Sequence, residues 1–342
     1  MNNCLNLNVP TIRHSDLRVI SKSLSLRKTN YYYENLNSNL EKNLKEFKQK
    51  KYININQDAQ LFKHRKKNLY KKRSEILKEE IFKNFNTNSK ILDFGCNKGE
   101  LLYRLKQSGF KKIFGYDINQ ASEKKLKRKK INFLNLNKIA EKKFDIIIFS
   151  HSLSYVKNIK KLLIILKKAL SRNGNIVINC ADVAKRPFIL CLGDQKYFFE
   201  KQMLKNLFKD FGSIKFIKSN YLTNDILSII SFNQKKRLKV KSINNKNFKI
   251  LKSKVKRINQ IKKKEKKIYI YHYNFQSMLI YNIINSKTTR IISIKKTQSH
   301  ENFIISIKEY LKSKTSIIIS KLEENKKIKY LIKKKNLKYY LI

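Results

Sequence analysis

Glycine is confined to one stretch of this chain. All seven glycines lie between Gly95 and Gly212, although the chain has 342 residues. Because glycine has no Cβ, it permits tight turns and a close approach of the backbone to a ligand. This stretch is therefore the part of the chain that backbone geometry constrains most, and the motifs that carry chemistry fall inside it.

Apolar strands and helical segments begin to alternate near residue 90. Short apolar runs predict strands at 91–94, 112–116, 131–135, 144–150, 175–180, 213–218 and 226–232. Helical segments separate several of them, such as 100–108, which Gly109 ends well. The run at 144–150 is apolar enough to be buried on both faces, as parallel strands are. The pattern predicts a doubly wound α/β domain over 89–232 with a mostly parallel, seven-stranded sheet.

The first strand leads into a loop that contains glycine, with the sequence ILDFGCNKGE. A ligand in such a fold sits at the carboxyl end of a parallel strand, where glycine lets the backbone approach it. The segment resembles the cofactor motif of class I S-adenosylmethionine-dependent methyltransferases, in which an acid and a Gly-x-Gly-x-Gly loop hold the methionine part of the cofactor. The resemblance implies cofactor contacts from Asp93, which would reach the ammonium group, and from Gly95, Cys96, Asn97 and Gly99. Asn97 stands at the family's middle glycine, and Asn tolerates left-handed backbone well.

The second and third strands end in further polar residues. Asp117 follows the second strand, where the resemblance implies that its carboxylate accepts hydrogen bonds from the two ribose hydroxyls of the cofactor. The alternative is a turn acid or a helix cap. Asn135 ends the third strand, where the family has an acid that contacts the adenine amino group; an ordinary turn residue is the alternative. Ile118 and Leu136, which follow these two residues, are the remaining cofactor contacts expected in this part.

The fourth strand and its loop read FDIIIFSHSLSYV, which resembles the family strongly. The loop after this strand touches both cofactor and acceptor in the family, so Ser150 is expected at the cofactor. His151 at the strand exit and Tyr155, which stands where relatives often carry His, are the candidate catalytic residues. Histidine has a pKa near neutrality, which suits a general base. The alternatives are a loop residue that packs beside the cofactor for His151 and a pocket wall for Tyr155.

The segments that flank the central domain carry weaker patterns. Residues 1–30 are expected to form a polar tail or the remnant of a module, and 31–88 a helical lead-in. Residues 233–264 contain no acid, and Phe248, Leu251, Val255, Ile258 and Ile261 share one helical face. This pattern predicts a basic linker helix within 233–266, which either packs its apolar face or serves as a nucleic-acid arm. Residues 267–342 predict a second, small Rossmann-like unit, with helices at 275–284 and 304–311 and strands between them.

The charge of the chain is extreme. Lys and Arg number 79 against 24 Asp and Glu, which gives a net charge of +55. Such a charge favours a polyanionic partner such as RNA, DNA or an anionic membrane surface. A gene with strong A/T bias would also produce many Lys, Asn and Ile and few Gly and Pro, so both explanations stay open.

Several classes of protein are not expected. The four cysteines include no Cys-x-x-Cys pair, which argues against a zinc ribbon or another metal site and is typical of the reducing cytoplasm. No apolar run approaches the roughly 20 residues that a membrane span needs. The N-terminus lacks the basic flank and apolar stretch of a signal peptide.

The order of the predicted domains indicates a class of methyl acceptor. A methyltransferase domain followed by a linker helix and a second Rossmann-like unit resembles the nucleotide-sugar C-methyltransferases, which implies a small-molecule acceptor carried by a nucleotide. The zinc-binding cysteines of that group are absent, and His272, Tyr273, Asn274 and Phe275 replace the glycine loop of its C-terminal unit. The alternatives are an RNA methyltransferase, supported by the charge, and a non-catalytic protein that binds the cofactor.

Overall fold

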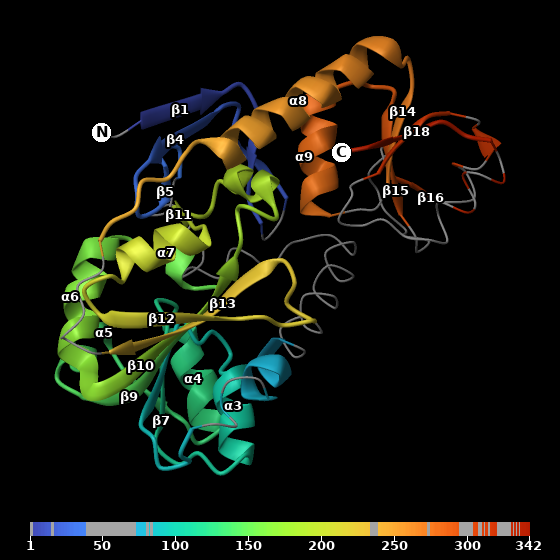
Figure 1. Cartoon of the computed structure of the whole chain (residues 1–342). Coiled ribbons are helices and arrows are strands. Elements are labelled where there is room, and N and C mark those ends of the chain that lie inside the picture. The colour runs from blue at the N-terminus through green and yellow to red at the C-terminus, as the bar shows by residue number, and fades with distance from the viewer. Residues whose placement is uncertain are drawn as a thin grey trace.

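In a computed structural model, the chain folds into three connected units (Figure 1). The structure describes residues 3–14, 17–38, 73–79, 82, 85–232, 239–271, 274–293, 304–306, 310, 312–313, 315–319, 330, 332, 334 and 336–342. An N-terminal β unit and a C-terminal α/β unit lie at one end of a larger central α/β domain, and a long helix runs from the first of these to the second.

The central domain is built on a seven-stranded sheet with the order β12-β13-β10-β9-β6-β7-β8. Its strands are β6 (Ile91–Phe94), β7 (Ile113–Tyr116), β8 (Asn132–Phe133), β9 (Phe144–Ser150), β10 (Leu170–Ala181), β12 (Gly212–Ile217) and β13 (Asp225–Phe232). Strands β6 to β10 pair in parallel, whereas β13 is antiparallel to both of its neighbours. The predicted mostly parallel seven-stranded sheet is confirmed, although the third strand is shorter than predicted.

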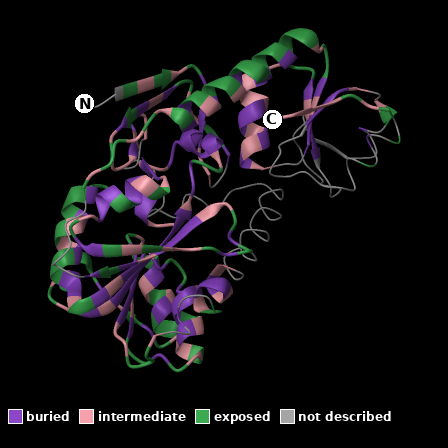
Figure 2. Cartoon of the chain, viewed as in Figure 1, coloured by how far each residue is buried: buried purple, intermediate pink, exposed green. Residues whose placement is uncertain are grey.

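Helices cover both faces of this sheet, which makes the fold doubly wound. One apolar cluster joins the sheet to α5 (Leu136–Ala140), α6 (Ile159–Ala169) and α7 (Lys201–Leu207). The other joins it to α3 (Glu100–Gln107), α4 (Ala121–Arg128) and the helical residues 73–79. All four residues of β6 are buried, and Figure 2 shows the central strands as the buried layer. Burial on both faces explains why the strands read as continuous apolar runs.

The N-terminal segment corrects the sequence prediction. The polar tail expected over 1–30 is wrong, because this region forms β1 (Asn3–Leu7), β2 (Thr11–Ile12), β3 (Val19–Ser21) and β4 (Leu24–Lys28). With β5 (Tyr33–Asn35) and β11 (Tyr197–Phe198), β1 and β4 make a four-stranded antiparallel sheet. The alternation of buried and less buried residues in β4 is the period-2 pattern of a half-buried strand. The less buried positions of β4 are Ser25 and Arg27.

The helical lead-in predicted for 31–88 is only partly right. Residues 33–35 are the strand β5, and residues 73–79 are helical. Residues 39–72 lie outside the described residues. The helix at 73–79 buries Ile76 and Leu77 against the central sheet, so the lead-in ends in the packing helix that its apolar residues predicted.

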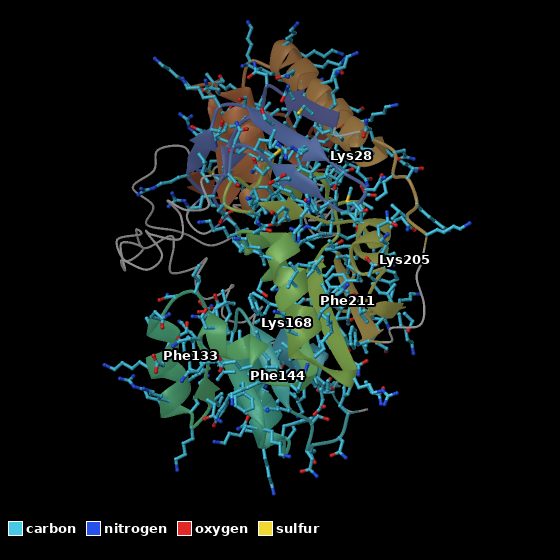
Figure 3. The ribbon with its side chains drawn as sticks, turned by 90° about the vertical axis from the view of Figure 1, so that its left-hand side faces the viewer. Lys28, Phe133, Phe144, Lys168, Lys205 and Phe211 are labelled. Carbon is cyan, nitrogen blue, oxygen red and sulfur yellow. The ribbon has the colours of Figure 1, made fainter. Side chains whose placement is uncertain are left out.

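Helix α8 (Lys246–Lys264) connects the central domain to the C-terminal unit. Its predicted face of Phe248, Leu251, Val255, Ile258 and Ile261 is buried in an apolar cluster that also contains residues of the N-terminal sheet and the C-terminal unit. The packing interpretation of this helix is thus confirmed at its apolar face. Figure 3 shows Lys28 where the N-terminal strands meet the chain leading into α8, and its Nζ donates to the carbonyl of Ile243 there.

The C-terminal unit contains a wholly parallel sheet with the order β16-β15-β14-β17-β18. Its elements are β14 (Ile268–Tyr271), α9 (Phe275–Ile284), β15 (Thr289–Ser293), β16 (Ile304–Ser306), β17 (Ile317–Ile319) and β18 (Tyr339–Leu341). The predicted small Rossmann-like unit is confirmed in its sheet. The helix predicted at 304–311 is wrong at its start, since residues 304–306 pair with β15.

Candidate active site

The loop after β6 holds an unusual backbone conformation. Gly95, Asn97 and Gly99 all have positive φ, at 91°, 50° and 65°. The amides of Gly95 and Cys96 both donate to the carbonyl of Tyr116 at the end of β7, at 2.7 and 2.9 Å. Asn97 therefore adopts the left-handed conformation that the family's middle glycine would supply, as the sequence suggested.

The loop leaves no room for a side chain at Gly95. A Cβ on Gly95 would lie 2.4 Å from Cβ of Ser152, which belongs to the loop after β9. Helix α3 begins directly after Gly99, and no side chain caps its first turn. The free amides of that turn consequently remain available at the carboxyl end of the sheet, where a ligand binds in folds of this kind.

Asp117 braces the loop from the neighbouring strand. Its Oδ2 accepts from the Asn97 amide and its Oδ1 from the Asn119 amide, both at 2.8 Å. Burial raises the pKa of Asp117, and these two amides and Lys125 oppose that shift. Each carboxylate oxygen accepts one such bond, so each retains a lone pair.

Asp93 is a buried acid without a partner. It is 3% exposed, and its Oδ1 makes no hydrogen bond within the described structure. Burial, followed by the nearby charge of Asp117, raises the pKa of Asp93 to about 7. A buried acceptor that lacks a donor is costly, and an ammonium group from a ligand would satisfy it.

The remaining predicted cofactor residues lie along the same edge. Ile118 and Leu136 are large apolar residues left 36% and 38% exposed. Asn135 precedes α5, and its side chain makes no capping hydrogen bond. Cys96 is buried, with its Sγ beneath the backbone of Gly115, and burial raises the pKa of its thiol far above the ordinary value. Cys96 therefore packs the loop from below rather than offering a thiolate.

His151 leaves β9 in a strained conformation and turns toward β13. Its φ is 56°, and its amide donates to the carbonyl of Asn179 at 2.7 Å. The ring Nε2 lies 2.9 Å from Oδ2 of Asp225. Ser150, the last residue of β9, pairs with Asn179 on β10. Non-glycine residues with positive φ often mark functional sites, because the surrounding structure must maintain the strain.

The sequence did not predict the partners of His151. Asp225 begins β13, and its Oδ2 also accepts from Nη2 of Arg73 and Nδ2 of Asn179, both at 3.3 Å. An acid at the start of an antiparallel strand beside a parallel one lies at the carboxyl edge of that parallel strand, so Asp225 carried a usable signal. Arg73 had none, since it comes from a helix distant in the sequence.

The two predicted catalytic residues contact different surroundings. Tyr155 ends the short 3₁₀ helix η3 (Leu153–Tyr155), and its hydroxyl accepts from Nε2 of Gln195 at 3.2 Å. Gln195 belongs to the segment that leads into β11, so Tyr155 faces the part of the chain that joins the N-terminal sheet. The structure thus brings His151 together with Asp225, and Tyr155 with Gln195.

Comparison with known proteins links part of the chain to a family. Residues 62–213 match the sequence model of a family described as a methyltransferase domain. The central unit is a class I S-adenosylmethionine-dependent methyltransferase domain. The chain is therefore an enzyme of the methyltransferase class, and S-adenosylmethionine is its cofactor. A search of curated proteins finds no match.

Three solved structures are each similar to less than half of this chain. A SAM-dependent methyltransferase of Archaeoglobus fulgidus is 19% identical over 48% of this chain and 93% of its own, with a TM-score of 0.39. One from Bacteroides fragilis, solved with S-adenosyl-L-homocysteine, is 19% identical over 42% and 73%, with a TM-score of 0.35. Magnesium protoporphyrin IX methyltransferase of Synechocystis PCC 6803 is 14% identical over 48% and 80%, with a TM-score of 0.36.

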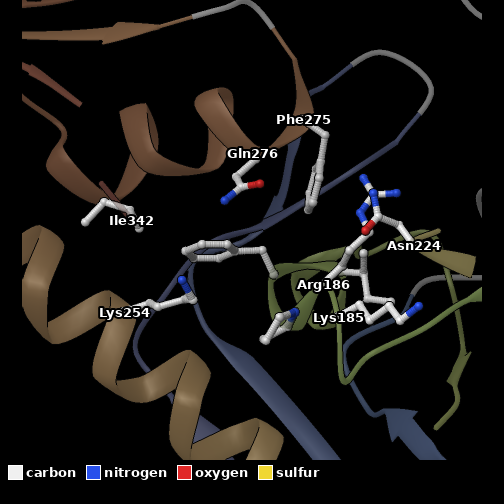
Figure 4. Close-up of a pocket in the computed structure, with 10 residues that line it drawn as sticks. Lys185, Arg186, Asn224, Lys254, Phe275, Gln276 and Ile342 are labelled. Atoms are coloured by element: carbon white, nitrogen blue, oxygen red, sulfur yellow. The ribbon is translucent and has the colours of Figure 1, made fainter. Parts of the chain in front are cut away.

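A pocket of about 420 Å³ opens where the methyltransferase domain meets the C-terminal unit (Figure 4). Three cations, Lys185, Arg186 and Lys254, line it together with the ring of Phe275 and the amide of Gln276. Asn224, the neighbour of Asp225 in the sequence, forms part of its wall. Neither Asp225 nor His151 lines the pocket, but the positive charge of Arg186 in its wall lowers the pKa of His151.

Two further findings concern only the part of the chain that the structure describes. No group of three or more His, Cys, Asp and Glu side chains there could hold a metal ion. No helix in the same described ranges is long and apolar enough to cross a membrane. All four cysteines are free.

Proposed function

We propose that the methyltransferase domain passes the methyl group of S-adenosylmethionine to a small anionic acceptor, a nucleotide-linked sugar, held in the basic pocket. The cofactor supplies a methyl group activated by a sulfonium sulfur. The observation that carries the acceptor class is the clustering of Lys185, Arg186 and Lys254 around one pocket, whose Arg186 is near enough to His151 to lower its pKa.

The candidate cofactor-binding residues lie at the ends of several strands, and each group would hold a different part of the cofactor. Asp93 would accept from the ammonium group, because its Oδ1 is buried and lacks a donor. The backbone of Gly95, Cys96, Asn97 and Gly99 and the open first turn of α3 would surround the methionine part.

The second part of the cofactor would lie along the ends of β7 and β8. Asp117 would accept from the ribose hydroxyls through its remaining lone pairs. Ile118 and Leu136, both left partly exposed, would cover the two faces of the adenine ring. Asn135 would accept from the adenine amino group, and Ser150 would lie beside the sulfur end.

Phosphate recognition explains the composition of the pocket. A nucleotide-linked sugar carries a diphosphate, which Arg and Lys bind through charge-assisted hydrogen bonds. The ring of Phe275 at the opposite wall could stack on the base. In this arrangement, His151 would act as general base toward the acceptor, and Tyr155 would line the passage between cofactor and acceptor.

The experiment uses two lysines of helix α8. Binding of uridine and thymidine diphosphates is measured by calorimetry for the whole chain and for Lys254→Ala, with Lys252→Ala as the matched control. Loss of a charge-assisted hydrogen bond should weaken binding by roughly tenfold or more in Lys254→Ala only. Equal effects of both substitutions would indicate a general charge effect and contradict the pocket.

The net charge of +55 favours RNA as a second candidate acceptor. Transfer of a labelled methyl group from S-adenosylmethionine is therefore measured with nucleotide-linked sugars and with total RNA. Label in the sugar fraction supports the proposal. Label in RNA with a steep salt dependence would replace it, and binding of the cofactor without transfer to either would indicate a non-catalytic role.

A further inference from the structure

His151 belongs to a cluster that draws on four separate elements. Asp225 comes from β13, Asn179 from β10, Arg73 from the helical residues 73–79, and His151 from the exit of β9. Three donors converge on one oxygen, because Oδ2 of Asp225 accepts from Arg73 and Asn179 and lies 2.9 Å from His151 Nε2. Such convergence of distant segments on one atom is a built site.

Burial separates the two ends of the cluster. The side chain of Asp225 is 5% exposed and that of Arg73 is 11% exposed, whereas that of His151 is 25% exposed. The imidazole therefore reaches from the buried acid toward the open edge of the sheet. Its other nitrogen, Nδ1, makes no hydrogen bond within the described structure and is the ring atom left to meet a ligand.

The charges around His151 favour its neutral form. Burial lowers the pKa of His151 first, and the nearby positive charge of Arg73 lowers it further, against the opposing effect of Asp225. Arg186 acts in the same direction as Arg73. Cys180 also lies close to Asp225, but burial raises the pKa of its thiol and keeps it neutral. Arg73 thus supplies a positive charge beside the Asp225 carboxylate, so the His151 imidazole does not have to be charged to balance it.

Asp225 itself stays ionised. Burial would raise its pKa, but His151, Arg73 and Asn179 outweigh burial and hold the pKa below the ordinary value. An ionised carboxylate can only accept a hydrogen bond, so the nitrogen that faces it must carry the proton. An ionised Asp225 therefore favours the tautomer in which Nε2 carries the hydrogen and Nδ1 the lone pair.

We propose that Asp225 is a positioning residue, which with Arg73 as its counter-charge fixes the proton of His151 on Nε2 and presents the Nδ1 lone pair to the methyl acceptor. The inference rests on the proposed function in one respect, that His151 serves as the base. The left-handed φ of His151 is the backbone cost of turning the ring into this position.

The proton and electron balance is complete with these groups. A lone pair of the acceptor forms the bond to the methyl carbon, and the C–S bond breaks with its electron pair going to sulfur. The proton of the acceptor passes to Nδ1, and Asp225 stabilises the imidazolium that results. Release of that proton to water returns His151 to its neutral form, and no oxidant or metal is required.

The experiment reads the tautomer directly. The full chain is labelled with ¹⁵N-histidine and saturated with S-adenosylhomocysteine, and two-bond ¹H–¹⁵N spectra are recorded between pH 5 and 8. The signal of His151 is identified by its loss in His151→Gln. We expect a neutral ring with the hydrogen on Nε2. A hydrogen on Nδ1, or a ring charged at pH 7, would overturn the proposal without any variant.

Three variants separate charge from geometry. In Asp225→Asn the amide oxygen should take the place of Oδ2 among its three donors, so the tautomer stays while the pKa of His151 falls by about one unit or more. In Asp225→Ala the tautomer preference should disappear. In Arg73→Gln the pKa of His151 should rise by about one unit. A His151 signal that ignores all three substitutions would sink the proposal.

Folding and function are controlled separately. S-adenosylhomocysteine affinity within about twofold of the wild type shows that a variant keeps its fold, since the cofactor edge is formed by other residues. Where turnover is measured, Asp225→Ala should lower kcat with little change in KM. Retention of the His151 signature without turnover on any acceptor would contradict the proposed function alone, whereas unchanged kcat in Asp225→Ala would contradict the positioning role alone.

Discussion

The molecule contains the same strand order twice. In the methyltransferase domain the five parallel strands run β8-β7-β6-β9-β10, and in the C-terminal unit they run β16-β15-β14-β17-β18. In each sheet the first strand of the chain lies at the centre, with the next two strands on one side and the following two on the other. Topology alone would place a ligand at the carboxyl end of the first strand in both.

The helices that follow the two first strands differ at their N-termini. Helix α3 starts after Gly99 with no side-chain cap. Helix α9 starts after Asn274, whose side chain accepts from the Ser277 amide at 2.9 Å, while the Ser277 hydroxyl donates to the carbonyl of Tyr271. The amides that could meet an anion are therefore left open in α3 and are partly satisfied by the chain itself in α9.

This difference shows what makes such a fold a cofactor site. The strand order supplies the place, but glycine and the missing cap supply the space and the free donors. The C-terminal unit keeps the strand order, but the side chain of Asn274 caps the helix at that position. The first two residues of α9, Phe275 and Gln276, line the pocket shared with the methyltransferase domain.

Filling the space after β6 should have the largest effect. Gly95→Ala would put a Cβ 2.4 Å from Ser152 and force a residue with a side chain to a φ of 91°. We expect the free energy of unfolding, measured by denaturant titration, to fall by about 3 kcal/mol. Binding of S-adenosylhomocysteine, measured by calorimetry, should weaken by about the same free energy.

Gly109→Ala is the matched control for that change. Gly109 has nearly the same φ, 90°, but its Cβ would meet only Thr87 Cγ2 at 3.6 Å. It should cost about 1 kcal/mol through backbone strain alone and leave binding intact. Equal effects of the two substitutions would show that the approach of Ser152 to the loop is unimportant.

Removing the carboxylate after β7 should have the next largest effect. Asp117→Ala would lose the charge-assisted hydrogen bonds to ribose, which lowers S-adenosylhomocysteine affinity by roughly ten- to a hundredfold. Asp117 also accepts a hydrogen bond from the Asn97 amide, so its loss could disturb the loop. Binding of an S-adenosylhomocysteine analogue that lacks the two ribose hydroxyls is therefore measured as well. The wild type should lose affinity for that analogue, while Asp117→Ala should bind both ligands equally. A variant that still discriminates between them would remove the ribose role.

The sequence predicted the geometry of the loops after β6 and β7 far better than the surroundings of His151. Gly95, Asn97, Gly99 and Asp117 lie within two consecutive strand–loop units, so local spacing determines their geometry. The partners of His151 come from residues 73, 179 and 225, and only the sheet order brings them together. No local pattern reports such an arrangement.

The N-terminal β unit escaped prediction for a related physical reason. Its sheet is completed by β11 of the central domain, and its apolar cluster includes residues of α8 and of the C-terminal unit. The strands are therefore stabilised by partners far along the chain rather than by their own propensity. Strand propensity depends strongly on such context.

The buried acid beneath the loop predicts a pH dependence. The pKa of Asp93 is raised to about 7, and only its ionised form pairs with an ammonium group. The ligand carries the α-amino group of a free amino acid, which stays protonated throughout the titration of Asp93. Affinity for S-adenosylhomocysteine should therefore rise up to about tenfold per pH unit between pH 5.5 and 7, then level off.

The stability of the free protein should move in the opposite direction over the same range. A carboxyl group with a raised folded pKa stabilises the fold when protonated, and that contribution is lost as the pH rises from about 4 through 7. Calorimetry at fixed ionic strength measures the first slope and denaturant titration the second. Asp93→Asn should remove both slopes, and a slope that survives in this variant would assign the titration to another group.

Opening the corresponding position of the C-terminal unit should have the smallest effect. Asn274→Ala removes the side chain that accepts from the Ser277 amide, so it should lower the free energy of unfolding by about 1 kcal/mol. S-adenosylhomocysteine affinity should stay unchanged, because α9 is not part of the cofactor edge. Ser286→Ala, at an exposed turn after the same helix, controls for a general effect on this unit. If Asn274→Ala instead weakened cofactor binding, the two units would be coupled. The N-termini of α3 and α9 could then not be compared as independent features.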